Sequence, residues 1–384
     1  MRPNASVFYG LMVILSIFTA CKKENEFRDP RGNNGNPNKP DTSKPSNPGN
    51  PANPDSIYVV KVKAVIGVGE LIYDSIPASL QVISWDSSNV QHQRQLSLQP
   101  GTNSVNLPKA HKKYQLKLTQ WGITDEMSFT KAELAEGTVI TLGGTKQAKK
   151  LQREESFLLV QGNYQPRGKT LFYYNGSGLV NKVDYYQKKP QHSDLQLTVT
   201  DKYVLSGARV DKINRLDGSG LPTGFTEFTY DAQGKVVNMH QKSYDQETFA
   251  AVEYGYASGG TEITIDYLYS NGNAMEYKMK FRGGNKIEDV ARSSTGGGEG
   301  GNYGYDFAIN PYAQMNMPDL YLSNLSKNNI ASQQKGYGGN IPSAVPYRFE
   351  YQYDADGYPV VLITSYKSYT TGEELYKIKK VFTY

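Results

Sequence analysis

The C-terminal part of this chain alternates apolar and charged residues and is punctuated by tight-turn signals, and this pattern limits how it can fold. In residues 275–281 and 347–353 every second side chain is apolar or aromatic, and those between are mostly charged. Side chains of a β-strand point to opposite faces in turn, so this period of two predicts strands with one tyrosine-rich face and one charged face.

A recurring turn motif separates these strands. In each copy an aromatic pair precedes Asp or Asn, two free positions and then Gly, as in "FYYNGSG", "FTYDAQG" and "YQYDADG". The aromatic pairs are Phe172/Tyr174, Phe228/Tyr230 and Tyr351/Tyr353, and the turns are Asn175 to Gly178, Asp231 to Gly234 and Asp354 to Gly357. Asp or Asn at the first position and a glycine at the fourth suit a type I turn, in which the glycine takes a left-handed conformation. The motif therefore predicts β-hairpins.

Composition supports an all-β fold. The chain of 384 residues holds 30 tyrosines and 37 glycines but only 2 tryptophans, and aromatic residues suit strands while glycine suits turns. We expect a small N-terminal β-sandwich (Ig-like) over residues 57–144, in which Trp85 and Trp121 belong to the core. A linker or short helix over 145–156 would follow, and then a large curled antiparallel β-meander or barrel-like domain over 157–384.

The first 56 residues read as an export and anchoring segment. A basic Arg2, a short apolar run and the sequence "FTAC" are typical of a secretory signal over residues 1–20, too short for a permanent membrane span. The single cysteine, Cys21, stands where it resembles the acylated first residue of a mature bacterial lipoprotein. Residues 21–56, rich in Pro, Asn and Gly, predict a disordered tether.

The turn and aromatic pattern resembles the YD-type hairpin repeats of secreted bacterial proteins. The whole layout, including "CKKENE" after the cysteine, is similar to Bacteroidota outer-membrane lipoproteins of unknown function with a porin-like C-terminal domain. This resemblance implies a curled antiparallel domain and an outer-membrane location, on the cell surface or the periplasmic face. It implies a membrane partner through the lipid, with palmitate among the acyl chains, and brings no catalytic residue.

Local motifs for enzymatic chemistry are sparse. The four histidines are isolated, and the glycines of "TGGGEGG" lie in a loop and not between a strand and a helix. "DADG" at Asp354 would need a carboxylate at position 365 to open an EF-hand loop, where Ser365 stands. We therefore expect no enzyme, cofactor or metal. A net charge of +5 without a basic stripe also argues against a nucleic-acid partner.

Three functions remain open. The first is a non-enzymatic lipoprotein with a binding or structural role, whose partner is a glycan or another envelope protein. Its ligand-binding candidates are the tyrosines of the predicted aromatic face: Tyr267, Tyr269, Tyr277, Tyr351 and Tyr353. The second is a membrane-embedded β-barrel, against which the strands look shorter than the nine to eleven residues needed for spanning. The third is a hydrolase whose catalytic carboxylates come from distant strands.

Overall fold

The computed structural model describes residues 57–384, apart from 75, 245, 258–259, 316, 318–325, 338–344 and 368–373. The predicted signal, the tether and Cys21 lie outside the described residues. Within the described ranges the chain is built almost entirely of β-strands, so the all-β prediction is confirmed. The described residues contain no helix long and apolar enough to cross a membrane.

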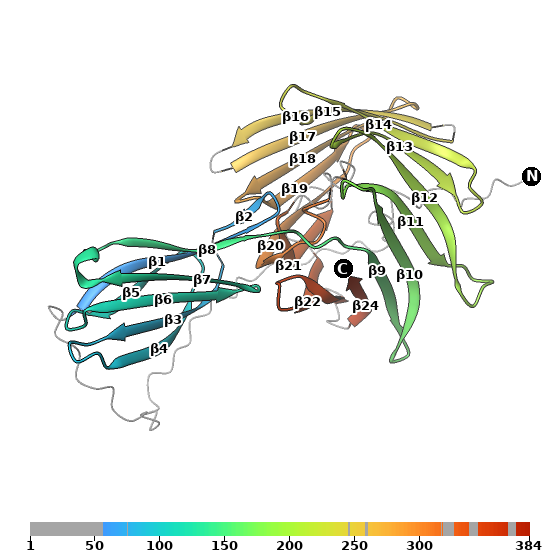
Figure 1. The fold of residues 1–384 in the computed structure, drawn as a ribbon. Helices are drawn as coiled ribbons and strands as arrows, with labels where there is room; N and C mark the ends of the chain where they lie inside the picture. The colour runs from blue at the N-terminus through green and yellow to red at the C-terminus, as the bar shows by residue number, and fades with distance from the viewer. Residues whose placement is uncertain are drawn as a thin grey trace, which may run out of the picture. The chain divides into compact units, whose positions relative to one another are not determined.

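The N-terminal region consists of two four-stranded sheets (Figure 1). One sheet joins β2, β1 and β5, with β8 paired in parallel to β1, and the other has the order β4-β3-β6-β7. The elements are β1 (Ile57–Val68), β2 (Leu71–Tyr73), β3 (Ala78–Trp85), β4 (Gln91–Leu98), β5 (Thr102–Pro108), β6 (Lys113–Gln120), β7 (Ile123–Thr130), the 3-10 helix η2 (Lys131–Glu133) and β8 (Val139–Lys146).

The alternating strands pack their apolar faces into one core. Val60, Val62 and Ala64 of β1 are buried there, as their period of two predicts. Trp121 is buried in the same core, but Trp85 is only half-buried, so the prediction for Trp85 is wrong. Ser84 faces inward with the other buried residues of β3, which turns Trp85 to the opposite face.

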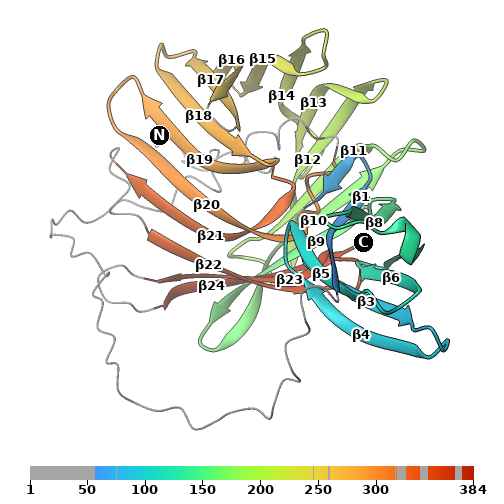
Figure 2. The ribbon, with the colours of Figure 1, turned by 90° about the vertical axis from the view of Figure 1, so that its left-hand side faces the viewer.

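The second region is a closed barrel of sixteen antiparallel strands in the described part of the chain. Its strands are β9 (Arg153–Val160), β10 (Asn163–Tyr174), β11 (Val180–Lys188), β12 (Leu195–Ser206), β13 (Arg209–Asp217), β14 (Pro222–Tyr230), β15 (Val236–Ser243), β16 (Gln246–Ala257), β17 (Gly260–Tyr269), β18 (Ala274–Arg282), β19 (Asn285–Ser293), β20 (Gly298–Ile309), β21 (Asn328–Tyr337), β22 (Val345–Tyr353), β23 (Pro359–Lys367) and β24 (Glu374–Thr383). Figure 2 shows β17 to β21 following one another along the wall.

The last barrel strand closes on the first. Ile378 of β24 faces Leu158 of β9, and the pairing runs to Thr383 opposite Arg153. The expectation of short strands is wrong, because β10, β12, β16 and β20 each have 12 residues. The range predicted as a linker or short helix is occupied by the end of β8, a segment without regular structure and the start of β9 at Arg153.

The predicted hairpin turns form as expected. In the turn at Asp231 the backbone N–H of Gly234 donates to the Asp231 carbonyl at 3.0 Å, and the φ of Gly234 is 81°. The side-chain Oδ1 of Asp231 also accepts from the backbone of Gln233 and Lys235. The turns at Asn175 and Asp354 repeat these contacts. The turn at Asp217 makes the same contacts, but no aromatic pair precedes it, so the sequence motif does not include it.

Candidate functional site

The two faces of the barrel wall differ sharply in chemistry. Phe172, Val183 and Asp201 are cross-strand partners on β10, β11 and β12, and all three are buried. Their face is the inner one, since it belongs to a core cluster that also takes in Tyr312 and Met317, from the connection between β20 and β21. The residues between them on each strand form the outer face.

The outer face of β13 to β19 carries a series of ion pairs. The Nζ of Lys212 lies 2.7 Å from Glu227 Oε1 on the neighbouring strand, and that of Lys242 lies 3.1 Å from Glu247 Oε1. Further along, Lys280 pairs with Glu288 at 3.1 Å. These side chains keep between 32 and 46% of their surface exposed. An outer surface against lipid would be apolar at these positions, because charges there are costly.

The predicted binding tyrosines divide into two groups. Tyr267, Tyr269 and Tyr277 lie on the inner face: Tyr267 and Tyr277 pack against the barrel core, and Tyr269 follows Tyr267 on the same face of β17. The ring centroids of Tyr267 and Tyr269 are 6.5 Å apart, with 18° between the ring planes. Their partners on β16 are the small residues Ala250 and Thr248, which leave little bulk beside the rings.

Tyr351 and Tyr353 stack on each other on β22, five strands along the barrel from β17, with ring centroids 5.6 Å apart. The hydroxyl of Tyr351 donates to the Ile330 carbonyl at 3.0 Å, and that of Tyr353 donates to Asp306 Oδ2. The structure therefore does not bring the five tyrosines together in one site. It places an aromatic pair on β17 and another on β22.

A buried polar network on the inner face contains Tyr277. Asp289 Oδ2 accepts from the hydroxyls of Tyr277 and Tyr303 at 2.6 and 2.7 Å, and from Lys286 Nζ at 2.7 Å. The side chains of Lys286 and Asp289 are only 8 and 10% exposed. Burial acts to raise the pKa of Asp289, but Lys286 and the two hydroxyls outweigh it, so this pKa lies below its usual value. No local sequence pattern predicts this network, because its members lie on three different strands, β18, β19 and β20, and meet only when these strands pair.

Burial shifts the other members of the network as well. It lowers the pKa of Lys286 despite the attraction of Asp289, and it raises the pKa of Tyr277 and Tyr303, with the Asp289 charge adding to the effect. Both phenols therefore stay protonated and act as donors at neutral pH. With the ammonium paired to the carboxylate, the network is saturated, which fits a structural role better than proton transfer.

A third aromatic group joins the last three strands. Tyr347, Tyr366 and Tyr376 are cross-strand partners on β22, β23 and β24, and each neighbouring pair of ring centroids is 5.3 Å apart. Register places these rings on the same face as Leu362 and Phe382, which pack against the barrel core. The predicted tyrosine-rich face is thus the inner wall.

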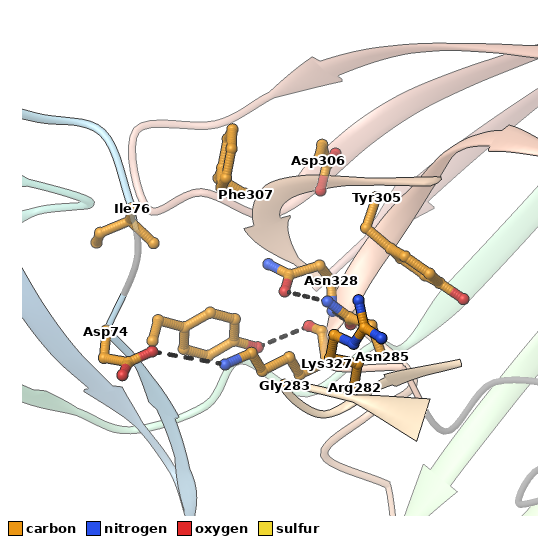
Figure 3. Close-up of a pocket in the computed structure, with 11 residues that line it drawn as sticks. Asp74, Ile76, Arg282, Gly283, Asn285, Tyr305, Asp306, Phe307, Lys327 and Asn328 are labelled. Carbon is orange, nitrogen blue, oxygen red and sulfur yellow. Dashed lines mark hydrogen bonds and ion pairs between the residues drawn. The ribbon is translucent and has the colours of Figure 1, made fainter. Parts of the chain in front are cut away.

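A small pocket of about 230 Å³ with both polar and apolar lining lies beside β2 and the turn between β18 and β19 (Figure 3). Tyr73 donates its hydroxyl to the Lys327 carbonyl at 2.9 Å, and Asn285 Nδ2 donates to Asn328 Oδ1 at 3.0 Å. Asp306 also lines the pocket, and burial raises its pKa. Most polar groups here bond to one another, so the pocket offers few free contacts to a ligand.

The "DADGY" turn contacts the N-terminal region, which the sequence did not predict. Lys149 Nζ lies 2.7 Å from both Asp354 Oδ2 and Asp356 Oδ2, and Tyr358 is fully buried in the core of the N-terminal sheets. The acidic residues that suggested calcium therefore bind lysine. The described residues hold no group of three or more His, Cys, Asp or Glu side chains placed to bind a metal.

No family model matches this chain, and no curated protein matches it. Among solved structures it is similar to a porin-like protein from Bacteroides uniformis, at 11% identity and a TM-score of 0.44, covering 62% of this chain and 98% of that one. It is also similar to a porin-like protein from Bacteroides vulgatus, at 14% identity and a TM-score of 0.38, covering 61% and 99%. The barrel itself rests on the strand pairing: its sixteen described strands close through β9 and β24.

Proposed function

We propose that the chain is a lipid-anchored envelope protein whose barrel faces water on its outside and binds a ligand, without catalysis, at the tyrosines of its inner wall. The observation that carries the proposal is the distribution of side chains across β13 to β19. Ion pairs such as Lys212 with Glu227 cover the outer face, and tyrosines and apolar residues cover the inner one. Acylation of Cys21 would supply the anchor.

The ligand class that fits best is a glycan. Tyr267 and Tyr269 present two nearly parallel rings 6.5 Å apart on one strand, and flat aromatic rings stack on the apolar faces of sugars. The buried carboxylates Asp201 and Asp289 are each paired with a cation, Arg215 and Lys286. A hydrolase would need carboxylates available to its substrate, so the binding role is favoured over the hydrolytic one.

A membrane-embedded barrel is the second candidate, and a specific observation favours it. The barrel is closed, antiparallel and even-numbered in its described strands, and its longest strands have 12 residues, enough to span a bilayer. The two candidates differ in what the outer face meets. Purified protein that stays monomeric without detergent and leaves liposomes impermeable to sugars supports the water-facing barrel, whereas pore formation would establish the second candidate.

Calorimetric titration against a panel of soluble polysaccharides tests the binding role. We expect saturable binding that is lost in Tyr267→Ala/Tyr269→Ala and kept in Tyr244→Ala, which removes a tyrosine that is 52% exposed in a turn. Stacking losses of about 1 kcal/mol per ring predict a fall in affinity of at least tenfold. Equal binding by both variants, or no heat with any glycan, would reject the inner-wall tyrosines as a glycan site.

A further inference from the structure

The outer face of the barrel is not uniform in charge. The outward residues of β16 to β19, here called the acidic wall, include six acids and four bases, a formal charge of −2: Glu247, Glu253, Glu262, Asp266, Glu276 and Glu288 against Lys278, Lys280, Arg282 and Arg292. About eight strands away in the barrel order, the outward residues are basic and aromatic and not acidic.

The outward residues of β23, β24, β9, β10 and β11 form what we call the lysine–tyrosine wall. Among its outward residues with described side chains and a regular cross-strand partner, six bases and two acids give a formal charge of +4: Arg153, Lys169, Lys182, Lys188, Lys377 and Lys379 against Glu155 and Asp184. Apolar and aromatic residues fill the positions between them: Phe157, Leu159, Tyr164, Leu171, Tyr173, Tyr186, Val361, Ile363 and Val381.

Lysines and tyrosines on this wall lie in contact. Lys182 Nζ is 3.8 Å from the ring centroid of Tyr173, and Lys169 Nζ is 4.3 Å from that of Tyr186. A third pair joins Lys379 and Tyr164 at 5.7 Å. Tyr164 and Tyr173 keep 36 and 38% of their surface exposed. Each pair thus presents an amphipathic ring beside an ammonium group.

We propose that the lysine–tyrosine wall binds an anionic membrane surface. Lysines attract anionic headgroups, while tyrosines and aliphatic side chains suit the boundary between headgroups and acyl chains. The acidic wall, on the other side of the strand order, would be repelled by the same surface. This inference rests on the proposed function, in which Cys21 holds the chain at a membrane, and it adds which wall the barrel turns toward that membrane.

A vesicle flotation assay tests the wall separately from the anchor. It uses the full chain with Cys21→Ser, which cannot be acylated, and phosphatidylcholine vesicles that contain phosphatidylglycerol. The wall variant is Lys169→Gln/Lys379→Gln, and the matched control is Lys278→Gln/Lys280→Gln on the acidic wall. Both variants remove two positive charges and keep the N-terminal segment, so they differ only in which wall of the barrel loses the charges. We expect a roughly 30-fold fall in partitioning for the wall variant, at about 1 kcal/mol per lysine, and little change for the control.

Thermal unfolding of both variants checks that the barrel still forms. Binding that falls equally in both, that is unchanged in the wall variant, or that is undetectable in the parent chain would overturn the proposal. Loss of binding on replacing phosphatidylglycerol by phosphatidylcholine is the expected companion result. Mass spectrometry at Cys21 tests the anchor itself, so failure of the anchor and failure of the wall are distinguishable.

Discussion

The hydroxyl oxygen of Tyr358 accepts a hydrogen bond from the backbone N–H of Lys149, with 2.9 Å between the two atoms. Tyr358 follows the Asp354 turn of the barrel, and Lys149 lies in the segment between β8 and β9. The fully buried ring of Tyr358 packs in the core of the N-terminal sheets. One hairpin turn therefore supplies both a turn for the barrel and a contact with the N-terminal region.

Substituting Gly357 by alanine should destabilise the protein by more than the cost of its backbone conformation. The φ of Gly357 is 82°, and a Cβ there would lie 2.6 Å from Trp121 Nε1. Alanine would pay about 1 kcal/mol for the left-handed conformation and a further 1 to 3 kcal/mol, roughly, for the overlap with the indole. Urea unfolding followed by circular dichroism measures the loss.

Gly272→Ala is the matched control for this substitution. Gly272 has a φ of 81°, and a Cβ there would meet nothing within 4 Å. It should therefore lose only about 1 kcal/mol. Equal losses in the two variants would mean that Trp121 does not pack tightly against the turn.

The contact between Lys149 and Asp356 should weaken in acid. Lys149 holds the pKa of Asp356 below its ordinary value of 3.8. A carboxylate with a depressed folded-state pKa adds stability above pH ~4, and this stability is lost as the pH falls through the folded-state pKa. Trp121 fluorescence in a Trp85→Phe background should change below pH ~4, and Asp356→Asn should remove that part of the change. An identical acid transition in Asp356→Asn would contradict the assignment.

The contact of Lys149 with Asp354 and Asp356 should also weaken in alkali, when Lys149 loses its proton. Burial acts to lower the pKa of Lys149, but its bonds to Asp354 and Asp356 outweigh burial and raise the pKa above 10.5. A base with a raised folded-state pKa adds stability below pH ~10, which is lost as the pH rises through the folded-state pKa. Lys149→Met should abolish the alkaline fluorescence change and reduce the acid one, because Lys146 still lies 3.3 Å from Asp356 Oδ1, while Lys150→Met should leave both changes in place.

Removing the carboxylate of Asp289 should cost far more than removing the whole ion pair. Asp289→Ala leaves the 8% exposed Lys286 without its partner and frees the hydroxyls of Tyr277 and Tyr303. A buried charge left alone typically costs about 3 to 5 kcal/mol. The double variant Lys286→Met/Asp289→Leu should recover part of that loss in urea unfolding. A double variant less stable than Asp289→Ala would show that the network contributes more than charge neutralisation.

The sequence predicted local structure well because local structure depends on neighbours in the chain. Asp231 and Gly234 suffice to define their turn, and the alternation around Met279 suffices to define which face is apolar. Trp85 was misplaced because its strand buries Ser84 on the core face, a choice that a serine does not signal. The turn at Asp354 was predicted, but its contact with Lys149 depends on residues 205 positions away.

The sequence does not predict the closure of the barrel or the contacts within the candidate sites. Strands β9 and β24 pair across more than 200 residues, and no local pattern distinguishes an open meander from a barrel. The alternation alone places Tyr267 beside Tyr269 on one face of β17, but cross-strand register decides that Tyr277 of β18 bonds to Asp289 of β19. Register is a property of the whole sheet.

Cysteine labelling in intact envelopes tests the water-facing barrel most directly. In the anchored chain, where acylation of Cys21 leaves no free thiol, Glu262→Cys and Lys278→Cys each place a thiol on the outer face, whereas Met279→Cys, where Met279 is 1% exposed, places one inside. A charged maleimide added without detergent should modify the two outer thiols rapidly and the inner one slowly. Outer thiols that react only after detergent removes the lipid would contradict the account and place the outer wall within the membrane.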